Sequence, residues 1–596
     1  MAQPRNSAAL VPSLKAVYAE IIAWYRDLLD DTTPPADLIW EPVKIGPTWQ
    51  WDPVSGWLLP EATLGWDFLA WCGYWLRGKG RKPWTFTAEQ ARFLLWYYAV
   101  DSSGDFLYHS AMFQRLKGHG KDPLASTVAA GSLHADVVFD HWEGDRPVGR
   151  DEPDAWTQII AVSQDQTKNT MKLFPSLISA EAQRHYGMQI GKLNVWSDGD
   201  RRQIEAVTAS VLAIEGGRPK QIVRSETQNW VSGNGGHDMA GAIEGNAAKA
   251  EREAPARILD IFNAYVPGRD SVAERARQAW ESTQGEDATA MEYGVLLDSL
   301  EAPPNAPLTA EAAPLVVRAI AGDSTWLDTR PHGRIVKSIL DPNNPPSESR
   351  RKWYNQITGT EDAWVDPRWV DQCIRKDMAL EDGDQVVLFG DGSKSDDATG
   401  LLACRMSDGF MQTLHVQHPG KGEIVSRSAV DDAVETAFDR FKVLAFWFDP
   451  SHAKDGDAVE DDRFWWPLVD DWHKRYHQRL KLWPVKTGPQ AHAVAFDMLK
   501  PGSQAVFQPA VSQLAEDLEA GVALHHGGTA LRQHMKNARR REGRYGVSIG
   551  KEHRSSARKV DLAVCAVGAR MLWRQLVLAQ RQSKGTPGKG RVIGLG

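Results

Sequence analysis

The chain has 596 residues, of which 42% are hydrophobic and 24% are charged. This composition is typical of a soluble globular protein with roughly two to four domains. The formal net charge is −8, so no chain-wide basic field points to nucleic acid, and a DNA-binding surface would have to be a local patch. The four cysteines are scattered, which predicts neither a zinc site nor a disulfide framework and fits a reducing cytoplasm. We find no signal peptide and no apolar run long enough to span a bilayer.

The first 82 residues form a Trp- and Pro-rich lead-in with an amphipathic helix near 14–29. Residues 83–87 then lead into a second helix, which has Gln90 near its start and an apolar face further on. An aromatic–Gln entry of this kind, just upstream of a phosphate-binding loop, often holds adenine. A capped helix with an exposed Gln fits the same residues equally well.

A glycine-rich stretch lies between an apolar run at 106–113 and a small-residue run at 124–133. This order predicts strand, tight loop and helix, in which backbone N–H groups and the helix N-terminus favour phosphate. The first glycine of the usual motif is missing, so an ordinary surface turn before a helix is the alternative. The candidate ATP-binding residues are Lys117, Gly118, His119, Gly120, Lys121 and Asp122, with Lys121 reaching the outer phosphates.

Four further strands are expected downstream, at 158–162, 205–210, 221–224 and, as the last of this domain, 258–262. Because strands alternate with helices, they predict a mostly parallel sheet with functional groups at the strand carboxyl ends. The strand at 221–224 runs into Ser225 and Glu226, where an acid would activate water.

A second domain is expected from residue 384 to 578, after a connector at 301–383 and before a disordered tail at 579–596. Asp391 follows its first strand, Asp449 ends a later strand and Asp561 opens a helix, as in a ribonuclease-H-like arrangement. In-line phosphodiester hydrolysis needs several carboxylates to hold two Mg²⁺ or Mn²⁺ ions. Asp397 is a plausible fourth acid. Each Asp alone could equally be a turn residue or a helix cap.

The densest basic segment of this acidic chain lies between the second and third acids. Its candidate DNA-binding residues are Arg539, Arg540, Arg541 and Lys551. Salt-dependent contacts to DNA phosphates are the functional interpretation. A solvated charged loop is the alternative.

Taken together, the chain resembles the large subunit of tailed-bacteriophage terminases over most of residues 83–578. The marks are an ordered set: the loop at 117–122, Ser225-Glu226-Thr227-Gln228-Asn229-Trp230, Asn263-Ala264-Tyr265-Val266-Pro267-Gly268, Trp353-Tyr354-Asn355, the hairpin from Asp391 to Asp397, Asp449-Pro450 and Val560-Asp561. The resemblance implies an α/β chain with a P-loop ATPase domain at 83–300, of mostly parallel sheet, and an RNase H-like nuclease domain.

The resemblance also implies roles for residues. Lys121 would bind the β and γ phosphates of ATP, Glu226 would activate water and Asn263 would couple hydrolysis to movement. Lys117 or Arg115 would touch the γ phosphate, unless a neighbouring subunit supplies an arginine. Asp391, Asp449 and Asp561 would hold the nuclease metals. Phosphate-loop ATPases usually hold Mg²⁺ with a loop hydroxyl and a strand-end Asp. Here Asp122 and Ser225 have traded those places, so they would share the ion, unless Asp122 merely caps its helix.

In that family the protein translocates double-stranded DNA into a procapsid and cuts the concatemer. The resemblance therefore implies a portal protein, a small terminase subunit and a homo-oligomeric ring on the portal. It also implies no membrane partner, and a place in the infected host's cytoplasm, transiently at the portal and not in the mature virion. Two rivals remain: an RNase H-like recombinase or resolvase fused to an ATP-binding domain, and a non-enzymatic phage assembly protein with a decayed ATP site.

Overall fold

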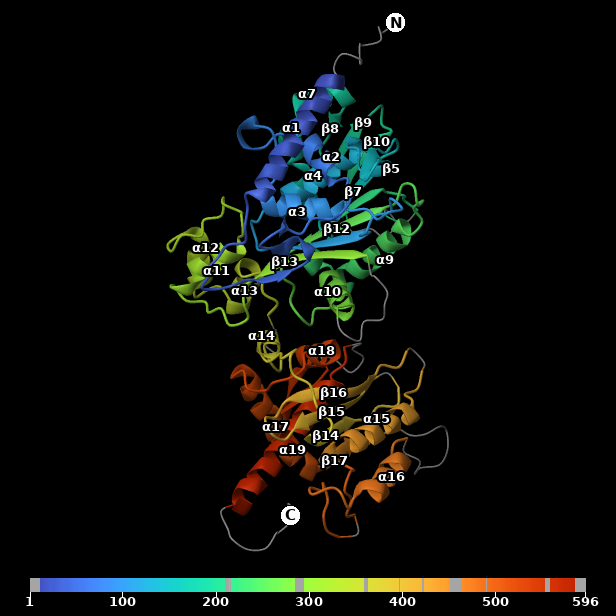
Figure 1. The fold of residues 1–596 in the computed structure, drawn as a ribbon, viewed down its shortest axis with the longest axis vertical. Coiled ribbons are helices and arrows are strands. Elements are labelled where there is room, and N and C mark those ends of the chain that lie inside the picture. The colour runs from blue at the N-terminus through green and yellow to red at the C-terminus, as the bar shows by residue number, and fades with distance from the viewer. Residues whose placement is uncertain are drawn as a thin grey trace. The chain divides into compact units, whose positions relative to one another are not determined.

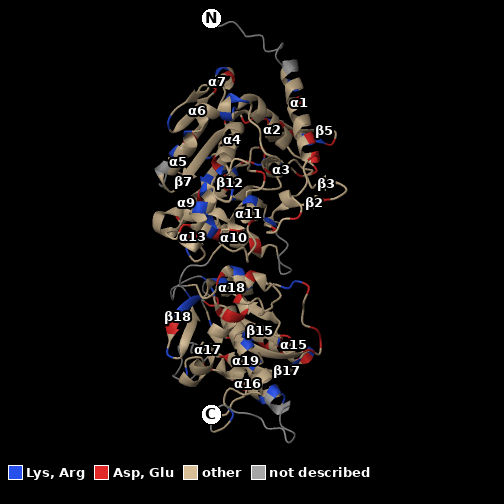
Figure 2. Cartoon of the chain, turned by 90° about the vertical axis from the view of Figure 1, so that its left-hand side faces the viewer, with Lys and Arg blue, Asp and Glu red and all other residues tan. Residues whose placement is uncertain are grey.

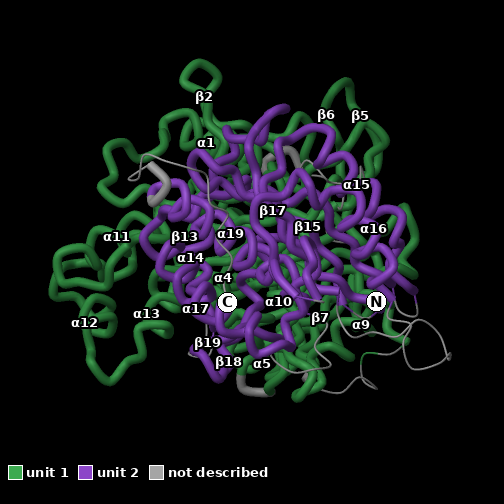
Figure 3. Tube along the Cα trace, turned by 90° about the horizontal axis from the view of Figure 1, so that it is seen from below, with its two compact units in different colours: residues 1–357 green, residues 358–596 purple. Residues whose placement is uncertain are grey.

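The computed structural model describes residues 11–208, 214, 216–284, 294–358, 363–395, 397–420, 423–450, 464–488, 490–551 and 558–584. The chain divides into two compact units, Met1–Ile357 and Thr358–Gly596 (Figure 3). The segment 301–383, predicted from the sequence as a connector, is therefore shared: its first part belongs to unit 1 and the rest to unit 2.

Unit 1 is built on a nine-stranded sheet (Figure 1). Its strands, in spatial order, are β1 (Val43–Ile45), β13 (Val295–Glu301), β4 (Ser110–Gln114), β12 (Arg257–Phe262), β11 (Gln221–Ser225), β7 (Trp156–Ala161), β10 (Arg202–Thr208), β9 (Asn194–Ser197) and β8 (Gln189–Ile190). The run from β13 to β10 is parallel, and β1, β9 and β8 pair antiparallel at the two edges.

Four of these strands, β1, β8, β9 and β13, were not expected from the sequence. We predicted 258–262 as the last strand of the domain, and this is wrong, because β13 follows it and pairs parallel with β4. The strand carrying the glycine-rich loop therefore lies between β12 and β13. Because β4 lies between β12 and β13, the ends of these two strands lie on either side of the loop that follows it.

Helices cover both faces of this sheet. Ile159 joins one core with α2 (Gly65–Trp75), α3 (Ala88–Tyr97) and α4 (Lys121–His134), whereas its neighbour Ile160 joins another with α9 (Gly236–Ala247). Side chains alternate between the two faces of a strand, so neighbouring residues of β7 enter the cores on opposite faces of the sheet. The other helices of the unit are α1 (Val11–Asp30), α5 (Gln164–Met171), α6 (Phe174–Leu177), α7 (Ala180–Tyr186) and α10 (Val272–Ser282). Two short hairpins complete it, β2 (Trp51–Asp52) with β3 (Gly56–Trp57) and β5 (Val138–Glu143) with β6 (Arg146–Arg150).

The last part of unit 1 is a small helical cluster made of α11 (Ala312–Ile320), α12 (Arg334–Leu340) and α13 (Pro346–Trp353). Its apolar core includes Val316, Val336 and Tyr354, and also Leu116 of the glycine-rich loop. The loop is thus packed into this cluster as well as joined to the sheet.

Unit 2 is built on a four-stranded sheet with the order β16 (Met411–Gln417), β15 (Thr399–Arg405), β14 (Gln385–Asp391) and β17 (Lys442–Asp449). The first three strands are antiparallel neighbours and β17 is parallel to β14. Helix α19 (Asp561–Lys584) packs on one face, against Phe389 and Cys404. Helices α15 (Arg427–Arg440) and α16 (Trp466–Tyr476) cover the other. Beside them lie α14 (Pro367–Gln372), α17 (Pro501–Glu519), α18 (Thr529–Asn537) and a hairpin of β18 (Arg539–Gly543) and β19 (Gly546–Gly550).

The α/β class is confirmed, with a mostly parallel sheet in the N-terminal unit and a ribonuclease-H-like strand order in the C-terminal unit. One expectation about apolar runs is wrong. Among the described helices, α19 is long and apolar enough over Asp561–Arg581 to cross a membrane by length and composition. Yet 67% of that window is buried, and α19 lies on β14 and β15, so it is a core helix. It continues to Lys584, through the start of the tail predicted at 579–596, and residues 585–596 lie outside the described part of the chain.

Candidate functional site

The glycine-rich loop joins β4 to α4, as predicted. Gly118 and Gly120 have φ of 84° and 99°, a left-handed backbone that glycine adopts without steric cost. Lys121 is the first residue of α4, and its Nζ donates to the carbonyls of Arg115 and Leu116, both at 3.2 Å. Burial lowers the pKa of Lys121 to about 8, while Glu226 and Asp122 act to raise it. The structure therefore brings Lys121, Asp122 and Glu226 into one electrostatic cluster.

Glu226 directly follows β11 and lies in a left-handed conformation with φ of 57°. Its backbone N–H donates to the Ile261 carbonyl of β12 at 2.8 Å, which fixes this turn to the neighbouring strand. A left-handed non-glycine residue is uncommon and marks a position set by its surroundings. Ser225, the last residue of β11, is 2% exposed. Desolvation and Glu226 raise the pKa of the Asp122 carboxyl, whereas Lys121 lowers it. The exchange of ligands between Asp122 and Ser225 stays a prediction.

Asn263 follows β12 and points back to the glycine-rich loop. Its Nδ2 donates to the Arg115 carbonyl at 2.8 Å, the same oxygen that accepts from Lys121 at 3.2 Å. The residue expected to couple hydrolysis to movement and the residue expected to bind phosphate thus share one acceptor. A change at Lys121 alters the hydrogen bonding at Asn263 directly.

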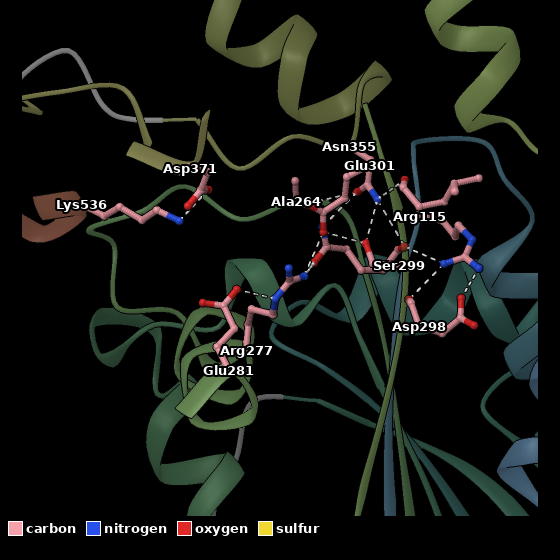
Figure 4. Close-up of polar contacts among 12 residues, drawn as sticks. Arg115, Ala264, Arg277, Glu281, Asp298, Ser299, Glu301, Asn355, Asp371 and Lys536 are labelled. Carbon is pink, nitrogen blue, oxygen red and sulfur yellow. Dashed lines mark hydrogen bonds and ion pairs between the residues drawn. The ribbon is translucent and has the colours of Figure 1, made fainter. Parts of the chain in front are cut away.

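The side chain of Arg115 is an anchor inside the protein. It is 1% exposed, pairs with the Asp298 carboxylate of β13 and donates to the carbonyls of Gln114 and Asp298 at 3.0 Å each (Figure 4). Thr48 donates to the same carboxylate. Of the two cations considered for the γ phosphate, Arg115 is therefore buried in an ion pair, whereas Lys117 is exposed.

Asn355 is a buried residue to which we assigned no role from the sequence, although it belongs to the Trp353-Tyr354-Asn355 mark. Its Nδ2 donates to the carbonyls of Leu300 at 3.0 Å and Gln114 at 3.3 Å, and its Oδ1 accepts from the Ala264 N–H at 3.2 Å (Figure 4). It thus fastens β4, β13 and the segment after Asn263 to one side chain. Asn355 has a φ of 49°, which Asn tolerates better than most residues. A single sequence does not reveal this backbone conformation.

Gln90 lies in a capping box at the start of α3. Its Oε1 accepts from the Thr87 N–H at 3.2 Å, and the Gln90 N–H donates to the Thr87 hydroxyl. The side chain is buried rather than exposed, and its Nε2 faces Gly120. His119 is also buried, with neither ring nitrogen hydrogen bonded in the described residues, and burial holds its pKa well below the usual value. Gln90 thus caps its helix and also lies against the loop.

The acids of unit 2 gather at one end of its sheet. Asp391 and Asp449 are directly opposite in the parallel pair of β14 and β17, and Asp561 is the first residue of α19. Asp391, Asp397 and Asp561 line one pocket. Burial, then Asp561, Asp449 and Asp397, raises the pKa of Asp391 well above its usual value. Burial, followed by Asp397, raises the pKa of Asp561 to about 6.

This donor set fits hard divalent cations. Buried carboxylates that repel one another need a compensating positive charge, and Asp561 Oδ2 is buried without a hydrogen-bond partner in the described residues. As the side chains lie here, no group of three or more His, Cys, Asp or Glu residues within the described ranges is close enough to hold an ion. Asp397 instead pairs with the ammonium groups of Lys551 and Lys559.

The predicted DNA-binding residues are not on one surface. Arg539 is 1% exposed and donates to the Lys536 carbonyl, so it belongs to the interior. Arg540 and Arg541 are exposed on β18, which carries basic residues in Figure 2. Lys551 follows β19 and reaches the acid cluster through Asp397. Residues 539–550 therefore form a hairpin, and Lys551, which follows it, contacts Asp397 of the candidate metal site.

Comparison with known proteins gives relatives from phages. No protein-family model matches the chain. It is 36% identical over 586 residues to the Gene 13 protein of Mycobacterium phage L5, covering 88% of this chain and 94% of the relative. The Gene 13 protein of Mycobacterium phage D29 is 36% identical over 587 residues, with the same coverage. Among solved structures, the large terminase of bacteriophage HK97 is similar at 16% identity and a TM-score of 0.43, covering 86% of this chain and 100% of that one.

Proposed function

This chain belongs to the family of the Gene 13 proteins of mycobacteriophages L5 and D29, and we propose that it is the large subunit of a phage terminase. In this proposal unit 1 hydrolyses ATP to move double-stranded DNA into a procapsid, and unit 2 cuts concatemeric DNA. The observation that carries the proposal is a pair of sites at strand carboxyl ends. Lys121, Glu226 and Asn263 form one, and the acid cluster of unit 2 forms the other.

In unit 1 the glycine-rich loop would take the phosphates of ATP. Lys121 would leave the loop carbonyls for the β and γ phosphates, and Glu226, held by its turn at the end of β11, would accept a proton from the attacking water. Mg²⁺ would neutralise charge on the phosphates, and Asp122 and Ser225 are the residues proposed to hold it. Asn263 would sense the change through the Arg115 carbonyl.

In unit 2 we propose that Asp391, Asp449 and Asp561, with Asp397, hold Mg²⁺ or Mn²⁺. Two such ions stabilise both the attacking and the leaving oxygen of a phosphodiester. The chain supplies the carboxylates on a rigid sheet end, and Arg540 and Arg541 would contact the DNA backbone without reading sequence.

If the chain is a terminase large subunit, its partners and its place in the cell can also be proposed. The partners would be a portal protein, a small terminase subunit and copies of this chain in a ring on the portal. The place would be the cytoplasm of the infected host and, transiently, the procapsid portal, with no membrane partner and no place in the mature virion. A recombinase or resolvase fused to an ATP-binding domain would also cut DNA, but without ATP-driven uptake. A non-enzymatic assembly protein would not turn over ATP.

The test is packaging in vitro with purified full-length protein and portal-bearing procapsids. The wild type should hydrolyse ATP faster when DNA is present and protect DNA from added nuclease. Lys121→Ala should abolish both, whereas Asp391→Ala should keep both and lose plasmid cutting. ATP turnover without DNA uptake under any condition would favour a recombinase or resolvase fused to an ATP-binding domain. No turnover at all would favour the assembly protein.

A further inference from the structure

A segment after α11 lies along the outer side of the glycine-rich loop. The Trp326 indole N–H donates to the Gly118 carbonyl at 3.0 Å, and the Ser324 hydroxyl donates to the His119 carbonyl at 3.4 Å. The Leu327 side chain lies 3.1 Å from the point where a Cβ on Gly118 would stand. Three consecutive loop residues from 118 to 120 are thus in contact with residues 324–327.

This segment is tied to the start of α3, next to Gln90. The Glu89 N–H donates to Asp323 Oδ2 at 2.8 Å, and the Asp323 N–H donates to Glu89 Oε1 at 3.0 Å. Gly322 makes the approach possible, because its φ is 56° and a Cβ there would stand 2.2 Å from Glu89 Oε1. Reciprocal hydrogen bonds of this kind fix the segment relative to Gln90.

The Trp326 side chain is held in place by a hydrogen bond and is also exposed to solvent. Its indole N–H is hydrogen bonded to the loop, yet the side chain is 53% exposed. Trp326 Cζ2 lies 3.2 Å, and Gln90 Nε2 lies 3.9 Å, from the point where a Cβ on Gly120 would stand. An exposed aromatic ring and a carboxamide therefore meet at Gly120, immediately before Lys121.

We propose that Trp326 is the stacking surface for the nucleobase of the bound nucleotide and that Gln90 lies at the edge of that base. The inference rests on the proposed binding of ATP at this loop, and it adds Trp326 to Gln90, which the sequence already connected with adenine. Stacking tolerates any base because every base has a π face. The indole would then set affinity, and the carboxamide, which both donates and accepts hydrogen bonds, would set the preference for adenine.

The decisive comparison is between a ligand with a base and one without. ADP and inorganic tripolyphosphate are titrated by calorimetry against the full-length wild type, Trp326→Ala and Trp326→Phe. Removing the ring should weaken ADP binding by about 5-fold to about 100-fold, the range found when a stacking aromatic is replaced by Ala. Tripolyphosphate affinity should not change. Trp326→Phe should keep most of the ADP affinity, because it loses the N–H donor but keeps a ring.

Two controls sharpen the test. Trp51→Ala removes an exposed tryptophan of the same unit, 36% exposed on the β2–β3 hairpin, and should change neither affinity. The fluorescence of Trp326 itself, taken as the difference between wild type and Trp326→Phe, should be quenched by ADP and not by tripolyphosphate. Gln90→Leu should lower the preference for ADP over GDP.

The inference is overturned if Trp326→Ala weakens ADP and tripolyphosphate equally, because Trp326 would then only support the loop. It is also overturned if ADP affinity is unchanged in Trp326→Ala. A wild type that binds neither ligand would instead overturn the proposed nucleotide function. If the wild type binds both ADP and tripolyphosphate, and Trp326→Ala and Trp326→Phe bind them as the wild type does, the role of Trp326 is refuted and the proposed nucleotide function is not.

Discussion

The buried ion pair between Arg115 and Asp298 offers the sharpest test of how the glycine-rich loop is held. Both side chains are 1% exposed, so Asp298→Ala leaves a guanidinium without its counter-charge in the interior. Breaking a buried pair in this way costs about 3–5 kcal/mol of unfolding free energy. Removing both partners, in Arg115→Met with Asp298→Ala, leaves no buried charge and should cost less than Asp298→Ala alone.

The assay is denaturant unfolding of the full chain, following the transition of unit 1. It compares the wild type, Asp298→Ala, Arg115→Met and the double variant, so that the cycle isolates the coupling energy. The matched control is Asp154→Ala, which breaks an exposed pair with Arg201 and should leave stability unchanged. If Asp298→Ala unfolds at the wild-type denaturant concentration, the pair does not anchor the loop. If Arg115→Met is fully stable but loses ATP turnover, Arg115 acts on the nucleotide instead.

Four further outcomes are expected. Asn263→Asp replaces the donor to the loop carbonyl with a carboxylate, so DNA-stimulated ATP turnover should fall about 10-fold, the equivalent of one lost hydrogen bond of about 1.4 kcal/mol. Unchanged turnover would contradict the shared acceptor. Arg540→Ala with Arg541→Ala should weaken DNA binding regardless of sequence and lower its salt dependence, and an unchanged salt slope would return the hairpin to a solvated loop. Asp391→Ala should abolish Mg²⁺- or Mn²⁺-dependent plasmid cutting while ATP turnover persists, and cutting at the wild-type rate would exclude this metal site. Tripolyphosphate affinity should fall as pH rises through about 8, because Lys121 loses its charge there; a flat profile from pH 7 to 9 would show that Lys121 does not carry the binding.

The central strand that the sequence missed, β13, differs from the predicted strand at 258–262 in how many polar residues it carries. The predicted strand at 258–262 is apolar except for Asp260, which is buried and paired with Arg224 of β11. In β13 the run is interrupted by Asp298 and Ser299, which are polar and suggest a loop. Both are nevertheless buried, because Arg115 neutralises Asp298 and Asn355 lies near Ser299. Two consecutive polar residues thus hid β13, whereas the single Asp260 did not hide the strand at 258–262.

Some of the candidate site residues could be predicted from the sequence and others could not. The glycine-rich loop and the three acids could be predicted because each stands at the end of a strand or the start of a helix, in a fixed order along the chain. Arg539 could not be told from Arg540 and Arg541, since charge alone does not reveal which residue of a strand turns inward. Trp326 is some 200 residues from the loop it touches. Such contacts follow from the tertiary fold.

The hydrogen bonds around the Arg115 carbonyl link the phosphate site to the rest of unit 1. That oxygen accepts from Lys121 and from Asn263. A phosphate that draws Lys121 away leaves Asn263 as the remaining one of these two donors, which strengthens its hold on the loop. The next residue, Ala264, is held by Asn355, at the end of the helical cluster whose core includes Leu116. If ATP binds at this loop as proposed, its phosphates would act on the helical cluster through these short, direct contacts. The coupling between Lys121 and Asn263 is measured by a double-mutant cycle of Lys121→Ala and Asn263→Asp on tripolyphosphate affinity.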